Sequence, residues 1–507
     1  MKSHIHLTPE KKGVRYAEVY TPQRKAGKKI NSPIYLGKVI NLEKGIFFNR
    51  KRGYFRYTIE KGFETCDFDF VPNEIALSLA EKSSILDFGS AYLLWHVLHM
   101  MGFFDILCSL CPSQSDSLLA LLFYRIQEHG GYNMASEWLA GSYAQMLFPK
   151  AQLTSQRISE LLKELGAEIV FRRFFSAYLK ATIPTDRKVG ILVDSTGLPN
   201  SIDMYLTALN NHNGVKSNET RLLLVVDKQS GKPLFFRYNP GNIKDVTTLH
   251  ATILELEAMN VDVSMAVLDA GYFSEDNVEE LCGAGIAFLS RLPSNRKLYK
   301  KLISEYHTEV LDACNIVKYG SRLVGIKRVT VPLCANIEGY AYVAVDYERR
   351  HNEWRKYTQD ALDDGTSVDE IRDHTIGQGF FVLICSENVT EKEILPLYYT
   401  RQAIEQIFDV NKNDIDILPL RVHSEETLRG HLMLSFIASL VYIFLNDKLK
   451  ATKFNACNAL AVYRNLKCMV YDNMTVVKEP VKNINDLSEV LGLSIPKKIV
   501  EGKTVGN

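Results

Sequence analysis

Residues 188–300 constrain the fold most, because apolar runs of strand length alternate there with amphipathic helical segments. The runs KVGILVD, RLLLVVD and PLFFRYNPG come first, then the helical DVTTLHATILELEAM, the run VSMAVLD, the helical SEDNVEELCGAG and the run IAFLSRLP. This order, β-β-β-α-β-α-β, predicts a mixed α/β layer that begins with a hairpin. No G-x-G-x-x-G follows a strand and no Walker-type G-x-x-x-x-G-K-[ST] is present, so nucleotide-cofactor binding lacks its signature.

Two of the apolar strands end in aspartate. Asp194 closes GILVD, and Asp269 closes MAVLD. Acidic residues at the exits of buried strands lie at the carboxyl edge of a sheet, where open α/β sheets bind ligands. Taken singly, each is more often a turn former or a helix cap than a catalytic group. The two together predict a ligand or metal site at one sheet edge.

A third carboxylate lies in the stretch LPLYYTRQAIEQIFDVNKNDI. Tyr398, Arg401, Glu405 and Lys412 have the spacing Tyr-x2-Arg-x3-Glu-x6-Lys. On a single helix at 100° per residue all four fall within an arc of about 60°. Such a stripe suits a phosphate backbone held beside a metal ion. The alternative is an ordinary solvated face, with Arg401 and Glu405 as an i,i+4 ion pair.

Three carboxylates that gather without neutralising bases favour hard divalent cations with oxygen ligands, Mg²⁺ or Mn²⁺. Two such ions can activate an attacking oxygen and stabilise the leaving oxygen at a phosphodiester. Tyr398, Arg401 and Lys412 would then hold phosphates and position a strand without reading its bases.

The set Asp194, Asp269 and Glu405, with the residues spaced around Glu405, resembles the DDE transposases of bacterial insertion sequences that carry a Tyr-Arg-Glu-Lys signature. The stretches DSTGLP, YNPGNIKDVTTL, DAGYFSEDN and LRVHSEETLRGH are also of that family's type, and the resemblance covers residues 188–450. It implies an RNase H-like core, and the 136 residues from Asp269 to Glu405 resemble the family's β-strand insertion.

The resemblance implies DNA transposition. The three carboxylates would ligate the divalent ions, and Tyr398, Arg401 and Lys412 would contact DNA near the cleaved end. Such enzymes bind terminal inverted repeats of double-stranded DNA as a homodimer in a synaptic complex, cleave phosphodiester bonds at the element ends and join the 3′-hydroxyl to target DNA. The alternatives are a transposase-derived DNA-binding protein without cleavage and a metal-dependent nuclease that only hydrolyses. A metal-free hydrolase with paired carboxylates is disfavoured by the cations beside Glu405.

The expected fold class is therefore α/β, an RNase H-like mixed-sheet core interrupted by a β-rich insertion and preceded by a small β-rich module and a helical region. The expected divisions are a basic β-rich N-terminal module (1–72), a helical, DNA-binding region (73–185), the first part of the core (186–300), the β-rich insertion (301–390), the second part of the core (391–450) and a C-terminal tail (451–507).

Charge is concentrated at the N-terminus. Residues 1–61 hold 15 Lys or Arg and 4 Asp or Glu, whereas the whole chain of 507 residues has a net charge of only +1. Aromatic residues are interleaved with these charges, which favours a folded basic module and an anionic partner such as nucleic acid. Farther on, LTSQRISELLKELG resembles the second helix of a helix-turn-helix, capped by Thr154 or Ser155. A capped bundle helix is the equal alternative.

Several features indicate a cytoplasmic protein, and the resemblance implies a bacterial or archaeal source and association with the nucleoid. The nine cysteines follow no disulfide framework, and the start of the chain lacks a signal-peptide core. Cys108 and Cys111 form a lone C-x-x-C, which we interpret as packed thiols. The apolar run 432–445 is short for a membrane span and predicts a buried helix. We interpret His423, Arg429 and His431 as structural rather than auxiliary catalytic groups.

Overall fold

The computed structural model describes residues 3–9, 14–25, 28–65, 83–200, 202, 204–212, 215–334, 337–365, 367, 371, 375–415, 417, 418, 420, 422, 424–471 and 474–500. The chain divides into two compact units, Met1–Ser83 and Ser84–Asn507. His423 lies outside the described residues.

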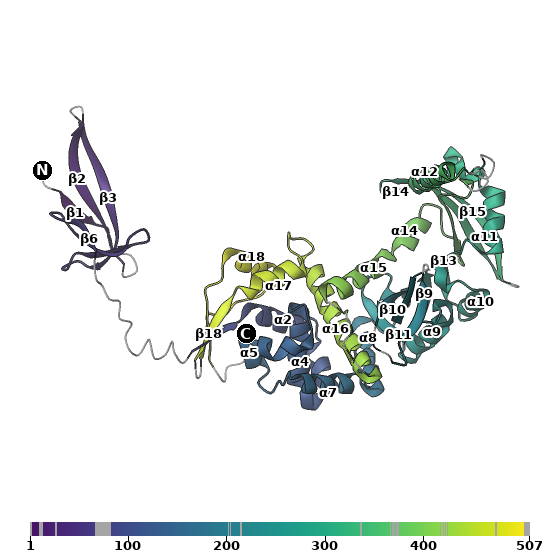
Figure 1. Ribbon diagram of the computed structural model, residues 1–507, viewed down its shortest axis with the longest axis horizontal. Helices are drawn as coiled ribbons and strands as arrows, with labels where there is room; N and C mark the ends of the chain where they lie inside the picture. The colour runs from purple at the N-terminus through teal and green to yellow at the C-terminus, as the bar shows by residue number, and fades with distance from the viewer. Residues whose placement is uncertain are drawn as a thin grey trace. The chain divides into compact units, whose positions relative to one another are not determined.

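The first unit is an antiparallel sheet whose six strands pair in chain order (Figure 1). Its core is small: six buried side chains, among them Val19, Phe47 and Phe55, line one face. The strands are β1 (His4–Leu7), β2 (Tyr16–Lys25), β3 (Lys28–Asn41), β4 (Ile46–Asn49), β5 (Gly53–Thr58) and β6 (Gly62–Thr65). The prediction of a small β-rich N-terminal module is confirmed.

The second unit contains a ten-stranded mixed sheet of order β11-β10-β8-β12-β13-β17-β16-β15-β14, with β9 paired to β10. Strand β8 runs parallel to β12 and antiparallel to β10, and β12 runs parallel to β13. The first strands are β8 (Val189–Pro199), β9 (Ala208–His212), β10 (Val215–Asp227), β11 (Pro233–Pro240), β12 (Val263–Leu268) and β13 (Ala287–Arg291). A hairpin of three antiparallel strands followed by two parallel strands is the RNase H-like order that the sequence predicts.

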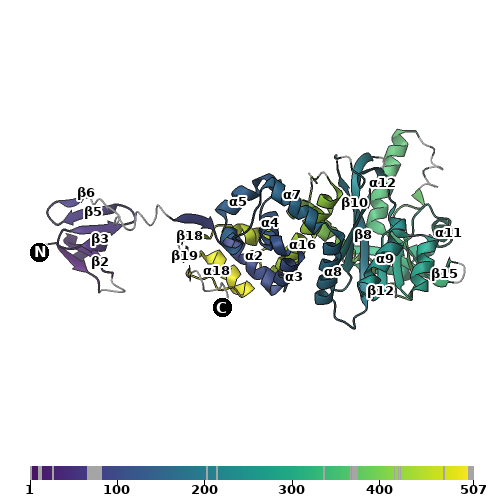
Figure 2. The same ribbon diagram turned by 90° about the horizontal axis from the view of Figure 1, so that it is seen from below.

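Helices cover both faces of these strands. Figure 2 shows α8 on one side of β8 and α9 on the other. Phe171 and Phe175 of α8 pack edge-on against Phe235 and Phe236 of β11, and Phe436 of α16 joins them. The elements are α8 (Glu168–Thr182), η3 (Asp245–Thr247), α9 (Leu249–Ala258), η4 (Ala270–Tyr272), α10 (Glu275–Gly283), α14 (Ile394–Tyr399), α15 (Gln402–Asp409), η7 (Val410–Asp414) and α16 (Glu425–Leu449).

The segment between the two parts of the core adds strands to the same sheet. β17 pairs with β13 of the core on one side and with β16 on the other, so the insertion continues the core sheet by hydrogen bonds. Its elements are α11 (Lys297–Tyr306), η5 (Glu309–Leu311), η6 (Ala313–Asn315), β14 (Ile316–Tyr319), β15 (Arg322–Cys334), β16 (Ile337–Asp346), α12 (Tyr347–Asp363) and β17 (Phe380–Cys385).

Helices before the core pack around α16. The close approach of α7 and α16 depends on two glycines: a Cβ on Gly430 would lie 1.9 Å from the carbonyl oxygen of Leu162, and one on Gly166 would lie 2.0 Å from that of Glu426. The elements are α2 (Gly89–Met100), α3 (Phe104–Leu110), η1 (Pro112–Gln114), α4 (Ser115–Gln127), η2 (Tyr132–Met134), α5 (Ala135–Gly141), α6 (Ala144–Leu147) and α7 (Ser155–Leu165).

Helix α16 has the length and apolar composition of a membrane span, but 83% of its most apolar window is buried inside this unit. Ser424 caps it in a capping box with Thr427. The interpretation of residues 432–445 as a buried helix is confirmed. Thr154 caps α7, as expected, and accepts a hydrogen bond from the amide of Arg157. A DNA-reading role for α7 stays a prediction.

The C-terminal stretch is folded, and its description as a tail was wrong. The strands β7 (Ser84–Asp87), β18 (Lys467–Tyr471), β19 (Met474–Val477) and β20 (Lys498–Val500) form a four-stranded antiparallel sheet, accompanied by α17 (Ala456–Arg464) and α18 (Lys482–Leu491). Tyr463 is fully buried and shares a 2.7 Å hydrogen bond with Ser488. In this sheet β7 pairs with β18, more than 350 positions later in the chain, and local sequence patterns do not reveal such a pairing.

Candidate active site

The register of two parallel strands brings Asp194 and Asp269 together. Val193 of β8 is the partner of Leu268, the last residue of β12, and each aspartate is the next residue along the chain. Neighbouring strands lie about 4.8 Å apart, so the two carboxylates lie side by side. One detail differs from expectation: β8 does not end at Asp194 but continues to Pro199, because its antiparallel pairing with β10 extends past the last parallel pair.

The Tyr398–Lys412 stretch crosses the sheet edge as a broken helix, not the single helix that the sequence predicts. α14 ends at Tyr399 and α15 begins at Gln402. The hydroxyl of Thr400 donates to the carbonyl of Leu397 at 2.7 Å, and the amide of Arg401 reaches back three residues at 3.3 Å, so the turn tightens. Lys412 then lies in the π-helical turn η7, a feature frequent at functional sites.

Arg401 bridges the two aspartates. Its Nη2 donates to Asp194 Oδ2 at 2.8 Å, and its Nη1 donates to Asp269 Oδ1 at 3.0 Å and to Tyr398 Oη at 3.0 Å. The Arg401 side chain is only 12% exposed. The Tyr398 hydroxyl also lies 3.5 Å from Asp269 Oδ1. Arg401 therefore supplies the counter-charge for both carboxylates.

Burial and this bridge determine the electrostatics. Burial raises the pKa of Asp194 above its usual value, although Arg401 opposes that effect. Burial also raises the pKa of Tyr398, to about 12. Burial acts to lower the pKa of Arg401, but Tyr398, Asp194 and Asp269 outweigh it, so the pKa of Arg401 is raised. The guanidinium stays charged, and Tyr398 stays a neutral hydroxyl, at any pH of interest.

Glu405 lines the same cavity as the aspartates, which is about 440 Å³ in volume. It is exposed, in contrast to the aspartate–arginine bridge. Lys412 donates from Nζ to Thr196 Oγ1 at 2.8 Å. Because alternate residues of a strand share a face, Lys412 lies over the face of β8 that carries Asp194. All six residues singled out from the sequence thus come from elements that meet at one sheet edge.

The cavity also contains basic residues that the sequence analysis missed. Arg291 comes from the end of β13, Arg322 from β15 and Arg349 from α12, and all three line the cavity. Arg322 pairs with Asp346 at 3.3 Å. No local spacing connects these residues, because three separate elements supply them. Arg291, at the end of a predicted strand, offered the one usable signal.

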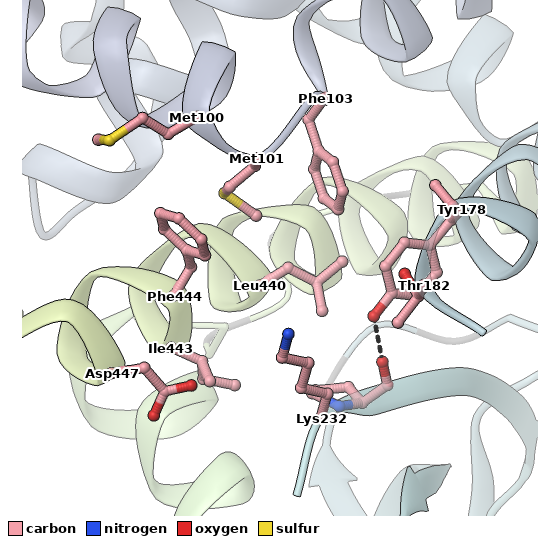
Figure 3. A pocket seen from close by; sticks show the side chains of 12 residues that line it. Met100, Met101, Phe103, Tyr178, Thr182, Lys232, Leu440, Ile443, Phe444 and Asp447 are labelled. Atoms are coloured by element: carbon pink, nitrogen blue, oxygen red, sulfur yellow. Dashed lines mark hydrogen bonds between the residues drawn. The ribbon is translucent and has the colours of Figure 1, made fainter. Parts of the chain in front are cut away.

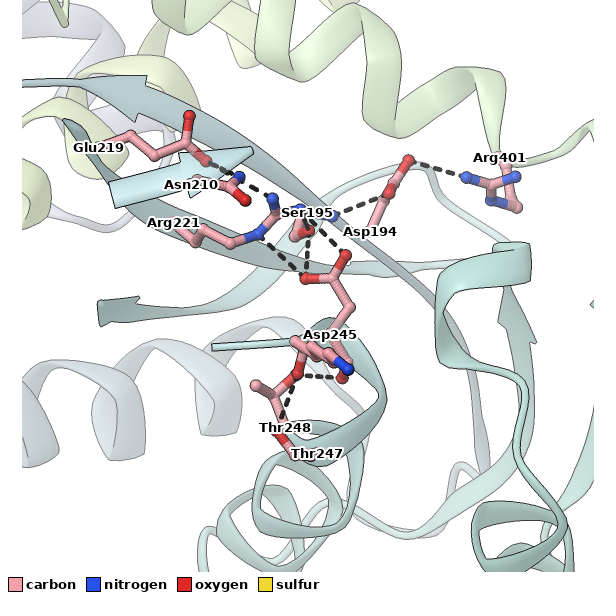
Figure 4. Close-up of polar contacts among 10 residues, drawn as sticks. Asp194, Ser195, Asn210, Glu219, Arg221, Asp245, Thr247, Thr248 and Arg401 are labelled. Carbon is pink, nitrogen blue, oxygen red and sulfur yellow. Dashed lines mark hydrogen bonds and ion pairs between the residues drawn. The ribbon is translucent and has the colours of Figure 1, made fainter. Parts of the chain in front are cut away.

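A second missed feature is the polar network that anchors Asp194 (Figure 4). The amide of Ser195 donates to Asp194 Oδ1 at 2.8 Å, and the Ser195 hydroxyl donates to Asp245 at 2.7 Å. Arg221 donates to both Ser195 Oγ at 2.6 Å and Asp245 Oδ2 at 2.9 Å. Arg221 is only 11% exposed, so the network fixes the backbone beside Asp194. Asp245 belongs to YNPGNIKDVTTL, a stretch that the sequence analysis noted without a role for this residue.

A divalent ion at this site would need the two aspartates and Glu405. Among the described residues, no three His, Cys, Asp or Glu side chains lie close enough to hold a metal as the side chains stand. The donors nevertheless fit, since three carboxylates on one cavity are the hard oxygen ligands of Mg²⁺ or Mn²⁺. In addition, Nε of Arg401 is buried without a hydrogen-bond partner among the described residues, so the bridge leaves Arg401 incompletely satisfied. The residues fit a metal once Arg401 moves aside.

A separate cavity of about 210 Å³ lies between α2, α8, α16 and the β10–β11 turn (Figure 3). Its wall is mainly apolar, with Met101, Phe103 and Leu440, and Lys232 and Asp447 at its edge. Tyr178 donates its hydroxyl to the carbonyl of Pro233 beside it. None of the candidate catalytic residues lines this cavity.

Cys108 and Cys111 lie at the end of α3. Cys111 is fully buried, and burial raises the pKa of its thiol to about 12. Both cysteines are free thiols. A protonated, buried thiol is a packing residue rather than a nucleophile.

His431 is structural. It is buried in α16, where Nδ1 accepts from the Tyr132 hydroxyl at 2.7 Å and Nε2 donates to the carbonyl of Ile417 at 3.0 Å. These partners satisfy the neutral ring. Burial, helped by Arg125, lowers the pKa of His431 to about 3.

This buried histidine predicts acid sensitivity. The unfolded chain takes up the His431 proton near pH 6.5, whereas the folded chain resists protonation until about pH 3, so stability falls as pH drops through that window. The loss attributable to His431 is about 2 kcal/mol between pH 6.5 and 5. Urea unfolding at both pH values should show a smaller loss in His431→Gln than in the wild type. His351→Gln, which alters an exposed histidine on α12, should keep the wild-type loss. Equal losses in the wild type and His431→Gln would contradict the assignment.

Comparison with known proteins gives one family. Residues 185–441 match the family model described as a transposase DDE domain. No curated protein matches the chain. Among solved structures, the chain is similar to the cryo-EM structure of a piggyBac transposase synaptic complex with hairpin DNA, at 10% identity over 69% of this chain and 70% of that chain. Its TM-score is 0.37, too low to carry any argument. Enzymes of the DDE family generally use divalent metal ions. Since the family model covers just over half of the chain, including Asp194, Asp269 and Glu405, the chain belongs to the DDE transposases.

Proposed function

We propose that this transposase binds the terminal inverted repeats of an insertion sequence, cleaves phosphodiester bonds at the element ends and joins the freed 3′-hydroxyl to target DNA. One observation carries the proposal: Asp194, Asp269 and Glu405, from three distant segments, line one cavity that also contains several arginines. That combination of clustered carboxylates and surrounding cations suits a phosphodiester and a divalent ion together.

Asp194, Asp269 and Glu405 would hold two divalent ions, Mg²⁺ or Mn²⁺. Bound there, such ions activate an attacking oxygen and stabilise the leaving one. Arg401, released from the aspartates, and Lys412 hold phosphate oxygens of the bound strand. The neutral Tyr398 hydroxyl, whose pKa burial raises further, to about 12, donates a hydrogen bond to the same strand.

Two displacements at phosphorus make up the reaction. In the first, the oxygen of water attacks phosphorus, the bond from phosphorus to the 3′-oxygen breaks, and the 3′-oxygen leaves with a proton as a hydroxyl. In the second, that hydroxyl loses its proton and attacks a phosphorus of target DNA, the bond from this phosphorus to the target's own 3′-oxygen breaks, and that oxygen leaves with a proton as a hydroxyl. The first step converts one phosphodiester into a phosphomonoester and the second exchanges one phosphodiester for another, so neither step needs an oxidant or a nucleotide. We propose that a homodimer holds the two ends in a synaptic complex.

Strand transfer tests the proposal directly. The substrate is a duplex that ends in the imperfect inverted repeat expected to flank the reading frame, incubated with plasmid target with and without Mg²⁺. Joined product that depends on Mg²⁺ supports transposition. Hydrolysis without joining would instead identify a nuclease, and binding without cleavage a DNA-binding protein that has lost catalysis.

Lys412 should contribute to DNA binding but not to metal binding. Lys412→Ala removes one phosphate contact, so affinity for the repeat duplex should fall and the slope of log affinity against log salt should flatten by about one. Fluorescence anisotropy at several salt concentrations measures both quantities. Lys482→Ala, on the exposed surface of α18 and outside the cavity, is the matched control. If Lys412→Ala has the same salt slope as the wild type, Lys412 does not contact a DNA phosphate.

A further inference from the structure

The N-terminal sheet has a second face, opposite its small core, which carries both aromatic rings and cations. Tyr16 of β2 is the cross-strand partner of Lys38 of β3, Lys38 is the partner of Phe48 of β4, and Phe48 is the partner of Tyr54 of β5. These four residues therefore form one row across four adjacent strands, which we call the aromatic row. At about 4.8 Å per strand it spans about 14 Å.

Strand alternation puts the row on the outer face. Ala17, Phe47 and Phe55 are buried in the core, and each is the chain neighbour of a row residue. A β-bulge at Leu36–Gly37, where Gly37 has φ of 98°, gives β3 one extra residue and so keeps Lys38 on the outer face. Tyr16 is 43% exposed and Tyr54 is 37% exposed, unusual for large aromatic residues in the middle of a sheet.

The rings are organised and surrounded by positive charge. Tyr35, 53% exposed, stacks on Tyr16 with ring centroids 6.4 Å apart. Phe48 and Tyr54 lie 4.9 Å apart. Exposed Arg50 and Lys51 lie in the loop that joins β4 to β5 next to this second pair, whereas Arg52 lies over Phe63 on the core side. Arg56, two residues after Tyr54, shares its face. Two acidic residues share this face: Glu18, which accepts a hydrogen bond from Tyr20 at 3.2 Å, and Glu64, the cross-strand partner of Arg56.

We propose that the aromatic row is a binding platform for single-stranded DNA. Bases of a single strand expose faces that stack on aromatic side chains, and cations beside the rings hold the phosphates. Bases in a duplex are already stacked on each other, so the rings discriminate against duplex DNA. A row of about 14 Å accommodates two or three bases.

Charge decides against the other occupants of such a face. The 15 Lys or Arg and 4 Asp or Glu of residues 1–61 repel a second copy of the same module and attract a polyanion. The inference rests on the proposed function only for the choice of DNA over RNA. It adds to that function a site for strands that have been separated at the element ends.

The test measures binding of fluorescein-labelled oligothymidylate by the full-length protein. Tyr54→Leu and, separately, Tyr16→Leu should each weaken binding roughly ten-fold, because each removes one stacking ring. Tyr54→Phe, which keeps the ring, should bind like the wild type. Ile34→Ala, an exposed apolar residue whose cross-strand partner Val19 is in the core, should also bind like the wild type. Affinity for a blunt duplex of equal length should change less than two-fold in all four variants.

Three results would overturn the inference. Oligothymidylate binding unaffected by both leucine variants would exclude stacking. Tighter, ring-dependent binding of oligouridylate would make RNA the ligand. Loss of self-association in Tyr54→Leu without loss of DNA binding, seen by sedimentation, would show that a second copy covers the face. Cleavage at the carboxylates is measured separately. Cleavage in the wild type together with oligothymidylate binding that does not depend on the rings would contradict only this inference. Ring-dependent binding without any cleavage would contradict only the proposed function.

Discussion

Glu405→Gln should reduce cleavage of a repeat-end duplex by about a thousand-fold or more, while DNA binding stays nearly unchanged. The substitution keeps the size of the side chain but removes the negative charge that a divalent ion requires of its third carboxylate. A thousand-fold loss corresponds to about 4 kcal/mol of transition-state stabilisation. Binding is spared, because it depends on cations that meet phosphates. Glu405 is exposed, so the melting temperature should also stay at the wild-type value.

The chain offers a matched control nearby. Glu426→Gln makes the same chemical change at a half-buried position in the first turn of α16, and Glu426 does not line the carboxylate cavity. Its cleavage rate should equal that of the wild type. Single-turnover cleavage and anisotropy on the same preparations measure both quantities. Cleavage retained in Glu405→Gln, or binding lost in step with cleavage, would remove Glu405 from the metal site.

Local sequence patterns predict that Asp194 and Asp269, which follow two apolar strands, lie next to each other in the site. Two apolar runs that each end in aspartate, within a β-α-β order, predict parallel neighbours and therefore adjacent carboxylates, and the pairing of Val193 with Leu268 agrees. The signature spacing likewise predicts that Tyr398, Arg401, Glu405 and Lys412 share one side of a helical segment. Such predictions succeed because strand and helix periodicity are properties of neighbouring residues.

Long-range packing determines the rest. The helix that carries the signature is tightened at Thr400 and widened at Lys412, because side-chain and packing contacts outweigh the regular helical repeat there. Arg322 and Arg349 reach the cavity because β17 joins the insertion to β13, a pairing that no local pattern encodes. The helical spacing predicts that Arg401 lies near Glu405. It does not predict that Arg401 lies between Asp194 and Asp269, because that position depends on how the strands of the sheet pair.

The bridge by Arg401 leads to the second large effect. Asp194 and Asp269 lie side by side, and the side chain of Asp194 is only 20% exposed. Without a cation between them the two carboxylates repel each other, and burial already disfavours the charged form of Asp194. Arg401 and a divalent ion held by this pair would therefore compete for the same oxygens. Nε of Arg401 has no hydrogen-bond partner among the described residues, so the arginine is not fully satisfied in the bridge, and the proposed function would have it turn toward the DNA phosphates when an ion binds.

Arg401→Gln should therefore destabilise the metal-free protein and strengthen its response to metal. In EDTA the free energy of unfolding should fall by about 3 kcal/mol, the cost of leaving a largely buried carboxylate without its partner. Adding Mn²⁺ should raise the melting temperature of Arg401→Gln more than that of the wild type, because no guanidinium has to be displaced. Arg322→Gln is the control: it alters another arginine of the same cavity, one that pairs with Asp346, and should keep the wild-type response to Mn²⁺. Differential scanning fluorimetry and Mn²⁺ titration calorimetry give both readouts without any DNA. Equal Mn²⁺ shifts in Arg401→Gln and the wild type would show that arginine and metal do not share the aspartates.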